Sequence, residues 1–324
     1  KIPRKSNIIN RGITMIDNLL GLKETSRDDI TAILDDAVKL KNDVLKQDIK
    51  KSNILSGKSI ITLFFENSTR TRVSFELASK YLGATAANIS AGGSSIAKGE
   101  TLIDTAKTLE AMGTDVIIIR HSMSGSPHLI SKYIGSKVIN AGDGMNEHPT
   151  QALLDIMTIR EKKGKVKGLK VAIVGDVKHS RVARSNIYGL NKLGAEVVLA
   201  GPSTLLPSNL EDMGVKVYTD VEKAVEGADV VMGLRIQLER QKKGLFPSIR
   251  EYNKYFGIDE RRLSLAKPDA ILMHPGPVNR GVELNPQVAD GSQSVINQQV
   301  TNGVCVRMAV LNMLANGKRY DNLV

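Results

Sequence analysis

A run of hydroxyl and guanidinium side chains stands where an apolar segment gives way to a helical pattern, in "FFENSTRTRVSFE" (64–76). Ser68 is a favourable N-cap, so the residues after it are predicted to form the first turn of a helix. Free backbone N–H groups and the helix dipole favour an anion there, and Thr69, Arg70 and Thr71 add side-chain donors. A capped surface helix with solvated arginines is the alternative. Three consecutive donors favour a phosphate site, although composition alone does not name the anion.

Other candidate ligand groups in the first half also lie at strand ends or helix starts. Arg120 ends the buried strand in "DVIIIRHS", a position at which open α/β sheets bind ligands. In "NEHPTQALLD", Pro149 suits the first helical position, so His148 and Gln151 can face the same way at a helix start. A histidine that only caps this helix is the simpler interpretation.

A glycine-rich segment, "GGSSIAKGE" (92–100), precedes another predicted helix and carries Ser94 and Lys98. Glycines give such a loop mobility, so a lysine on it could reach an anion and close over it. The alternative is a solvated lysine on an exposed loop.

The second half places single cations after its strands. Arg181 follows "AIVGDVKHS", which lacks the G-x-G-x-x-G fingerprint and therefore predicts no dinucleotide cofactor. Arg235 and Gln237 follow another strand in "MGLRIQ", and arginines suit bidentate recognition of carboxylates. The Pro-Gly-Pro turn at 275–277 projects carbonyl groups that can accept hydrogen bonds from an amine or amide, unless it is only a rigid turn.

The elements that must position these residues alternate between apolar strands and helices, which predicts parallel sheets covered by helices. Strands are expected near 58–65, 86–90, 115–119, 137–140, 169–177, 195–201, 215–219, 228–234 and 269–277. Helices are expected near 26–47, 69–82, 101–112 and 127–134, after His148, and in a long C-terminal stretch. The predicted fold class is α/β, with two Rossmann-like domains, each a mostly parallel sheet flanked by helices and joined by bridging helices. The predicted domains are 1–147, onto which a C-terminal helix at 293–316 packs back, and 148–292.

Length and composition agree with an ordinary globular protein that has anionic partners. The 324 residues suggest two domains, and 45 Lys and Arg against 34 Asp and Glu give a net charge of +11. Aromatic residues make up 4% and Trp is absent, so stacking platforms for nucleic acid are scarce. The single Cys305 excludes an internal disulfide and a cysteine-based zinc site and fits a reducing compartment. The sequence shows neither a membrane-spanning run nor a signal peptide, so a cytoplasmic location is expected.

The stretch "FFENSTRTRVSFE" resembles the carbamoyl-phosphate signature of the aspartate and ornithine carbamoyltransferase family, and "FEN" before "STRTR" resembles its aspartate branch. The similarity extends from about residue 15 to 316, in order and without large gaps. It implies that 1–147 is a carbamoyl-phosphate-binding domain and 148–292 an aspartate-binding domain. It also implies a cis bond between Gly276 and Pro277.

The resemblance assigns roles to the candidate residues. Those implied to bind carbamoyl phosphate are Ser68, Thr69, Arg70, Thr71, Ser94, Lys98, Arg120, His148, Gln151, Gly276 and Pro277. Those implied to bind L-aspartate are Lys98, Arg181, Arg235, Gln237 and Pro275. The implied catalytic residues are Arg70, Thr71, Arg120 and His148, without a cofactor or a metal. In the aspartate branch the residues matching Ser94 and Lys98 come from the neighbouring subunit, which implies a homotrimer with shared sites.

The second half decides between the branches. Ornithine enzymes typically carry a Ser-Met-Gly motif and "HCLP" where this chain has "LRIQ" and "HPGP", and a dicarboxylate acceptor needs two cationic clamps. The expected reaction is carbamoyl transfer from carbamoyl phosphate to L-aspartate, an early step towards pyrimidines. Alternatives are an ornithine or other carbamoyltransferase, or a non-catalytic binder of anions or nucleic acid. A regulatory chain or a dihydroorotase is a possible further partner, and the sequence indicates neither.

Overall fold

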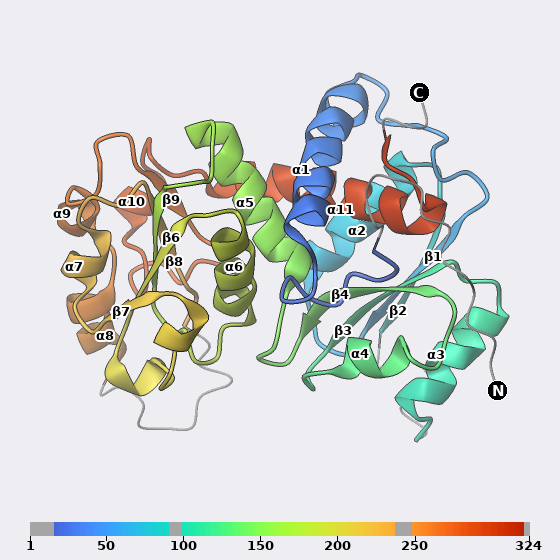
Figure 1. Cartoon of the computed structure of the whole chain (residues 1–324), viewed down its shortest axis with the longest axis horizontal. Helices are drawn as coiled ribbons and strands as arrows, with labels where there is room; N and C mark the ends of the chain where they lie inside the picture. Colours follow the sequence, from blue (N-terminus) through green and yellow to red (C-terminus); the bar gives the residue numbers. More distant parts are fainter. Residues whose placement is uncertain (1–15, 91–98, 237–247, 321–324) are drawn as a thin grey trace.

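Two parallel β-sheets organise the two halves of the chain (Figure 1). The computed structural model describes residues 16–90, 99–236 and 248–320. The first sheet has the strand order β2-β1-β3-β4 and contains β1 (Ser59–Phe64), β2 (Thr85–Ser90), β3 (Val116–His121) and β4 (Lys137–Asp143). The second has the order β7-β6-β5-β8-β9 and contains β5 (Lys170–Val174), β6 (Glu196–Ala200), β7 (Lys216–Tyr218), β8 (Val230–Gly233) and β9 (Ile271–Met273). The predicted α/β fold class with two mostly parallel sheets is confirmed.

Helices cover both faces of the first sheet. They are α1 (Arg27–Leu40, continued by a π-helical turn at Lys41–Leu45), α2 (Thr69–Tyr81), α3 (Leu102–Ala111) and α4 (Ser126–Ile130). Because successive side chains of a strand point to opposite faces, Ile60 and Ile118 join the core formed with α1 and α2. Their neighbours Ile61 and Ile117 pack instead with residues of α3 and α4. The sheet is therefore buried on both faces, as expected for parallel strands.

The second sheet is covered in the same way. Val171 and Ile173 of β5 pack on the face that carries α6, whereas the intervening Ala172 packs with residues of α7. The helices of this half are α6 (Arg181–Lys192), α7 (Val221–Val225), α8 (Ile249–Phe256), α9 (Glu260–Leu263) and α10 (Pro286–Ala289). Two short 3-10 turns lie at Ser203–Leu205 and Glu211–Met213.

Two long helices connect the halves. Helix α5 (Pro149–Lys163) follows β4, and α11 (Ile296–Asn316) follows the second sheet and packs against α1, α2 and α5. Side chains of both helices belong to one core that includes residues of both sheets. The expected long C-terminal helix is present, and Figure 1 shows it, in red, running behind α1 and α5 towards the first sheet.

The helix expected near 69–82 is present as α2. Its face that packs on the core is formed by Phe75 and Ala78, whereas Val73 is 43% exposed. None of the helices within the described residues is long and apolar enough to cross a membrane.

Candidate active site

A cavity of about 980 Å³ lies at the carboxyl ends of strands from both sheets. All the predicted site residues that the structure describes line it: Ser68, Thr69, Arg70, Thr71, Arg120, His148, Gln151, Arg181, Arg235, Pro275, Gly276 and Pro277. The first sheet contributes the segments after β1, β3 and β4, and the second contributes those after β5, β8 and β9. The predicted residues Ser94, Lys98 and Gln237 lie outside the described residues.

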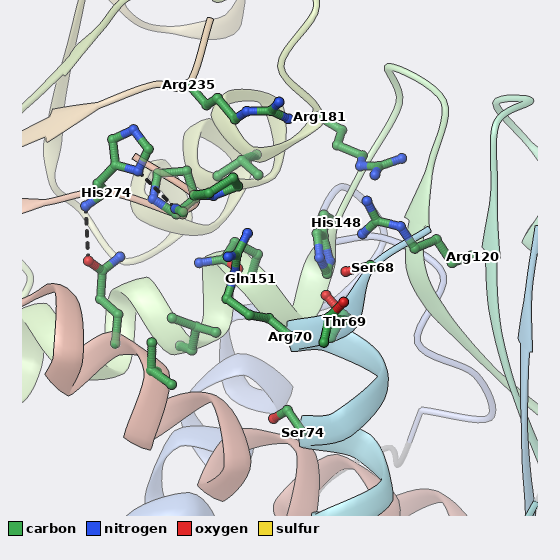
Figure 2. Close-up of a pocket in the computed structure, with 18 of the residues that line it drawn as sticks. Ser68, Thr69, Arg70, Ser74, Arg120, His148, Gln151, Arg181, Arg235 and His274 are labelled. Carbon is green, nitrogen blue, oxygen red and sulfur yellow. Dashed lines mark hydrogen bonds between the residues drawn. The ribbon is translucent and has the colours of Figure 1, made fainter. Parts of the chain in front are cut away.

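The N-terminus of α2 opens into this cavity. Ser68 occupies the N-cap position with extended backbone angles (φ −160°, ψ 99°), but its side chain makes no capping hydrogen bond. The sequence predicted the position of this cap but not the free hydroxyl, which Figure 2 shows beside Thr69 and His148. First-turn N–H groups together with hydroxyls at a helix start form an anion site. Arg72 is exposed and does not line the cavity.

The charge of the lining is strongly positive. Among the described lining residues, Arg70, Arg120, Arg181, Arg235, Arg280 and Arg307 are cationic and only Glu66 is acidic. Figure 2 shows four of these arginines around the pocket, Arg70 and Arg120 from the first half and Arg181 and Arg235 from the second. The lining therefore favours a ligand with several negative charges.

Glu66 connects the two halves across the cavity. Its Oε1 accepts hydrogen bonds from Arg120 Nη2 (2.8 Å) and Arg181 Nη2 (2.7 Å), and its Oε2 accepts one from Arg181 Nη1 (3.1 Å). Glu66 follows β1, whereas Arg181 begins α6, so this ion pair joins the two sheets. A substrate anion that reached either guanidinium would compete with Glu66 for it.

Burial and positive neighbours set the ionisation of the cavity's polar groups. His148 is buried, and the lost hydration together with Arg120, Arg181 and Arg307 lowers its pKa well below the usual value. Its imidazole is therefore neutral at neutral pH and can donate one hydrogen bond. Its Nδ1 has no hydrogen-bond partner among the described residues. Burial and the nearby Arg235 also lower the pKa of Arg70. A bound anion would raise this pKa again.

The Pro-Gly-Pro turn closes the second-half side of the cavity. The Gly276–Pro277 bond is cis, as predicted, and Gly276 has a φ of 68°, a left-handed conformation that glycine adopts without strain. The Gly276 N–H donates to Nδ1 of His274 (2.8 Å), which places the ring proton on Nε2, 3.2 Å from Glu283 Oε1. A dashed line in Figure 2 marks the bond between Gly276 and His274. The turn is thus held by the ring of a buried histidine.

Two family descriptions match the sequence. Residues 17–161 match the aspartate/ornithine carbamoyltransferase carbamoyl-P binding domain, and residues 167–314 match the Asp/Orn binding domain of the same family. The chain belongs to the aspartate/ornithine carbamoyltransferase family.

Individual carbamoyltransferases show the same similarity. The aspartate carbamoyltransferase catalytic subunit of Ruminiclostridium cellulolyticum is 66% identical over 297 residues, which are 92% of this chain and 95% of that protein. The structure of aspartate transcarbamoylase from Trypanosoma cruzi with carbamoyl aspartate and phosphate has a TM-score of 0.83 at 31% identity, covering 91% of this chain and 95% of that one. Ornithine carbamoyltransferase from Pyrococcus furiosus also has a TM-score of 0.83, at 33% identity, covering 94% of this chain and 100% of that one. Fold similarity alone therefore does not separate the two branches of the carbamoyltransferase family.

Several polar residues at or beside the cavity were not predicted as part of the site. They include Gln299 and Arg307, which line the cavity, and Asp155, which accepts a hydrogen bond from Gln299. Glu66 also lines the cavity, although it lies inside the stretch that carried the resemblance. A usable signal exists for two of them, because Asp155 and Arg307 stand in otherwise apolar helical runs, "ALLDIMTI" and "GVCVRMAV". A charged residue among core residues is rarely buried unless it is paired.

Proposed function

We propose that this chain is an aspartate carbamoyltransferase, which transfers the carbamoyl group of carbamoyl phosphate to the amino group of L-aspartate. The products are N-carbamoyl-L-aspartate and phosphate, in an early step towards pyrimidines. The observation that carries this proposal is the cavity itself, in which the start of α2 lies opposite Arg181 and Arg235. It suits a phosphate on one side and a dicarboxylate on the other. The names of the 56–66% identical relatives support aspartate as the acceptor.

In this proposal the first half binds carbamoyl phosphate. The start of α2 and Arg70 bind the phosphate, with Ser94 and Lys98 completing its site. Arg120 and the neutral His148 donate hydrogen bonds to the carbamoyl oxygen. The carbamoyl NH2 group donates to Gln151 and to carbonyl groups of the Pro-Gly-Pro turn.

The second half binds L-aspartate. Arg181 holds the α-carboxylate, and Arg235 with Gln237 holds the β-carboxylate. Bidentate contacts between guanidinium and carboxylate groups fix the orientation of the amino acid. The Pro275 carbonyl and Lys98 complete the contacts, and the amine then lies beside the carbamoyl carbon.

The reaction needs positioning and charge stabilisation rather than a covalent intermediate. Attack of the amine on the carbamoyl carbon forms a C–N bond and moves the carbonyl electrons onto oxygen. Thr71, Arg120 and His148 stabilise this oxyanion. Collapse of the intermediate breaks the bond to phosphate, whose charge the α2 start and Arg70 offset, and the departing phosphate accepts the amine proton. Closure of the two halves would exclude water from the hydrolysable donor.

The proposal includes a division at residues 1–147 and 148–292, with α11 returning to the first domain, and a cytoplasmic homotrimer with shared sites. Two surface features support contact with a second copy. The edge strand β2 has exposed residues on both faces. Large apolar side chains are also exposed around α3, α4 and the turns after β3 and β4, namely Met112, Met123, Leu129, Tyr133 and Met145. A trimer would cover such surfaces. A regulatory chain or a dihydroorotase remains a possible partner of that trimer.

The deciding experiment is an assay of ureido product with carbamoyl phosphate and either L-aspartate or L-ornithine. We expect N-carbamoyl-L-aspartate and no citrulline. Product formed only from L-ornithine would show that the chain is an ornithine carbamoyltransferase. Binding of carbamoyl phosphate without product from either acceptor would favour a non-catalytic anion binder.

A further inference from the structure

Asp155 is a buried carboxylate that the proposed mechanism leaves without a role. It lies on α5, one turn after Gln151, and its side chain is fully buried. Its Oδ1 accepts hydrogen bonds from Nε2 of Gln151 (3.0 Å) and Nε2 of Gln299 (2.7 Å). Its Oδ2 accepts one from Nδ2 of Asn186 (2.8 Å). One carboxylate therefore receives amide NH2 groups from three helices, α5, α6 and α11.

A carboxylate can only accept hydrogen bonds, so it fixes which way these amides face. The carbonyl oxygen of Gln151 must point away from Asp155, and Gln151 lines the cavity. The carbonyl oxygen of Gln299 must also point away, and it accepts the backbone N–H of His274 (3.0 Å). The His274 ring in turn accepts the N–H of Gly276 (2.8 Å). Figure 2 draws these two hydrogen bonds of His274.

We propose that Asp155 is a positioning residue for carbamoyl transfer, whose ionised carboxylate orients Gln151 and Gln299 so that hydrogen-bond acceptors face the carbamoyl NH2 group. Gln151 presents its oxygen directly, and Gln299 acts through His274 on the Pro-Gly-Pro turn. This inference rests on the proposed function, because the orientation of the two amides matters for catalysis only if a carbamoyl NH2 group binds in the cavity. A purely structural Asp155 would need hydrogen bonds to three helices, but not acceptors on the cavity side.

The substitution Asp155→Asn distinguishes a positioning role of Asp155 from a purely structural one. Asparagine has nearly the same shape, but its NH2 group must face either Asn186, at the Oδ2 position, or both Gln151 and Gln299, at the Oδ1 position. Inversion of Asn186 is opposed because its Nδ2 also donates to the Val182 carbonyl (3.1 Å). The Gln151 amide is therefore expected to turn its NH2 group into the cavity, against the NH2 group of the carbamoyl moiety. A misdirected buried hydrogen bond of this kind lowers kcat roughly 10- to 100-fold.

The double variant Asp155→Asn with Gln151→Glu tests the orientation itself. The exchange keeps the charge of the pair, since the carboxylate moves from residue 155 to residue 151. The introduced glutamate would accept from the introduced asparagine with one oxygen and offer the other oxygen to the carbamoyl NH2 group. We expect kcat at least roughly tenfold above that of the single Asp155→Asn variant. Gln151→Glu alone would place two carboxylates against each other and should be nearly inactive.

A matched control is available in Asp36, which is also fully buried and accepts hydrogen bonds from Tyr320 N (2.9 Å) and Arg319 Nη2 (3.3 Å). It does not line the cavity. Asp36→Asn should lower stability without lowering kcat. Binding of inorganic phosphate, measured by calorimetry, should be unchanged in Asp155→Asn, because the α2 start is untouched.

Three outcomes would overturn the proposal. The first is a folded Asp155→Asn variant with kcat within about threefold of the parent, less than the loss of one buried hydrogen bond predicts. The second is a folded double variant no faster than the single one. If neither variant folds, the parent decides, because its kcat must fall when Asp155 is protonated. Burial raises the pKa of Asp155 to about 6, and Arg307 is the charged group that faces it. The third outcome that would overturn the proposal is therefore a parent enzyme whose kcat at saturating substrates does not change between pH 7 and 5. Failure of the proposed function itself would be recognised separately, since the parent would then form no carbamoyl aspartate.

Discussion

Lowering the pH from 7 to 5 should slow this enzyme while removing an unfavourable contribution to its folding. Burial raises the pKa of Asp155 from its usual 3.8 to about 6, although Asn186, Gln299 and Gln151 lower it again by hydrogen bonding. A carboxyl group whose pKa is raised by folding is less stable ionised in the native state than in the unfolded chain. The destabilisation by Asp155 is therefore absent below its unfolded pKa, and it is complete once the pH has risen through its folded pKa. Activity has the opposite dependence, because the orienting form of Asp155 is the ionised one.

The magnitudes follow from the two pKa values of Asp155. The difference of about two units corresponds to about 3 kcal/mol of destabilisation at pH 7, where the group is ionised in both states. At pH 5 the native state is mostly protonated at this site, and roughly half of that penalty remains. The ionised fraction falls from roughly nine-tenths at pH 7 to roughly one-tenth at pH 5, so kcat should fall nearly tenfold.

The assay compares the parent with Asp155→Asn at pH 7, 6 and 5. Urea denaturation gives the free energy of unfolding of each protein, and initial rates at saturating substrates give kcat. Groups that titrate in both proteins cancel in the difference, so the free energy of unfolding of the variant minus that of the parent should fall by about 1 kcal/mol between pH 7 and 5. A difference that grows as the pH falls would refute the reasoning. So would a parent whose kcat does not change over this range.

Three further perturbations test the proposed site. Arg70→Ala should lower kcat by roughly 100- to 1,000-fold with an unchanged circular dichroism spectrum, and near-normal turnover would contradict the phosphate site. Gly142→Ala should raise the KM for aspartate roughly tenfold, because its Cβ would lie 2.9 Å from Cζ of Arg181; an equal rise in the KM for carbamoyl phosphate would show that the change is not confined to the aspartate clamp. Mixed trimers of inactive Ser68→Ala and Lys98→Ala chains should regain part of the activity. Without recovery in trimers shown to be mixed, each site would lie within one chain.

Much of the fold could be predicted from the sequence because parallel strands buried on both faces leave continuous apolar runs. The runs that contain β1, β3 and β5 are of this kind, and the glycines and polar residues after them mark the strand ends. The candidate site followed for the same reason, since ligand-binding residues stand at those strand ends. The helix start that we propose to bind phosphate could be located from local sequence alone, because the helix start and its donors are contiguous.

What the sequence did not predict depends on contacts between distant segments. Glu66 pairs with Arg181 across 115 positions, and Gln299 donates to Asp155 across 144. No local pattern reports such pairs, although a lone acidic or basic residue in an apolar helix indicates that a partner must exist. The orientation of Gln151 could not be predicted either, because its motif indicates the residue but not that Asp155 orients its amide.

Because of the position of α11, the first half of the chain cannot finish folding until the second half has been synthesised. This helix is the last described one, yet it packs against α1 and α2 and completes the core of the first sheet. About 170 residues separate the end of β4 from the end of α11, which at roughly 5 to 20 residues per second takes the ribosome roughly 9 to 35 seconds. The first half is therefore made early but completed late. During this interval its nascent apolar surface is open to chaperones, and a chain that stops before residue 296 never closes it.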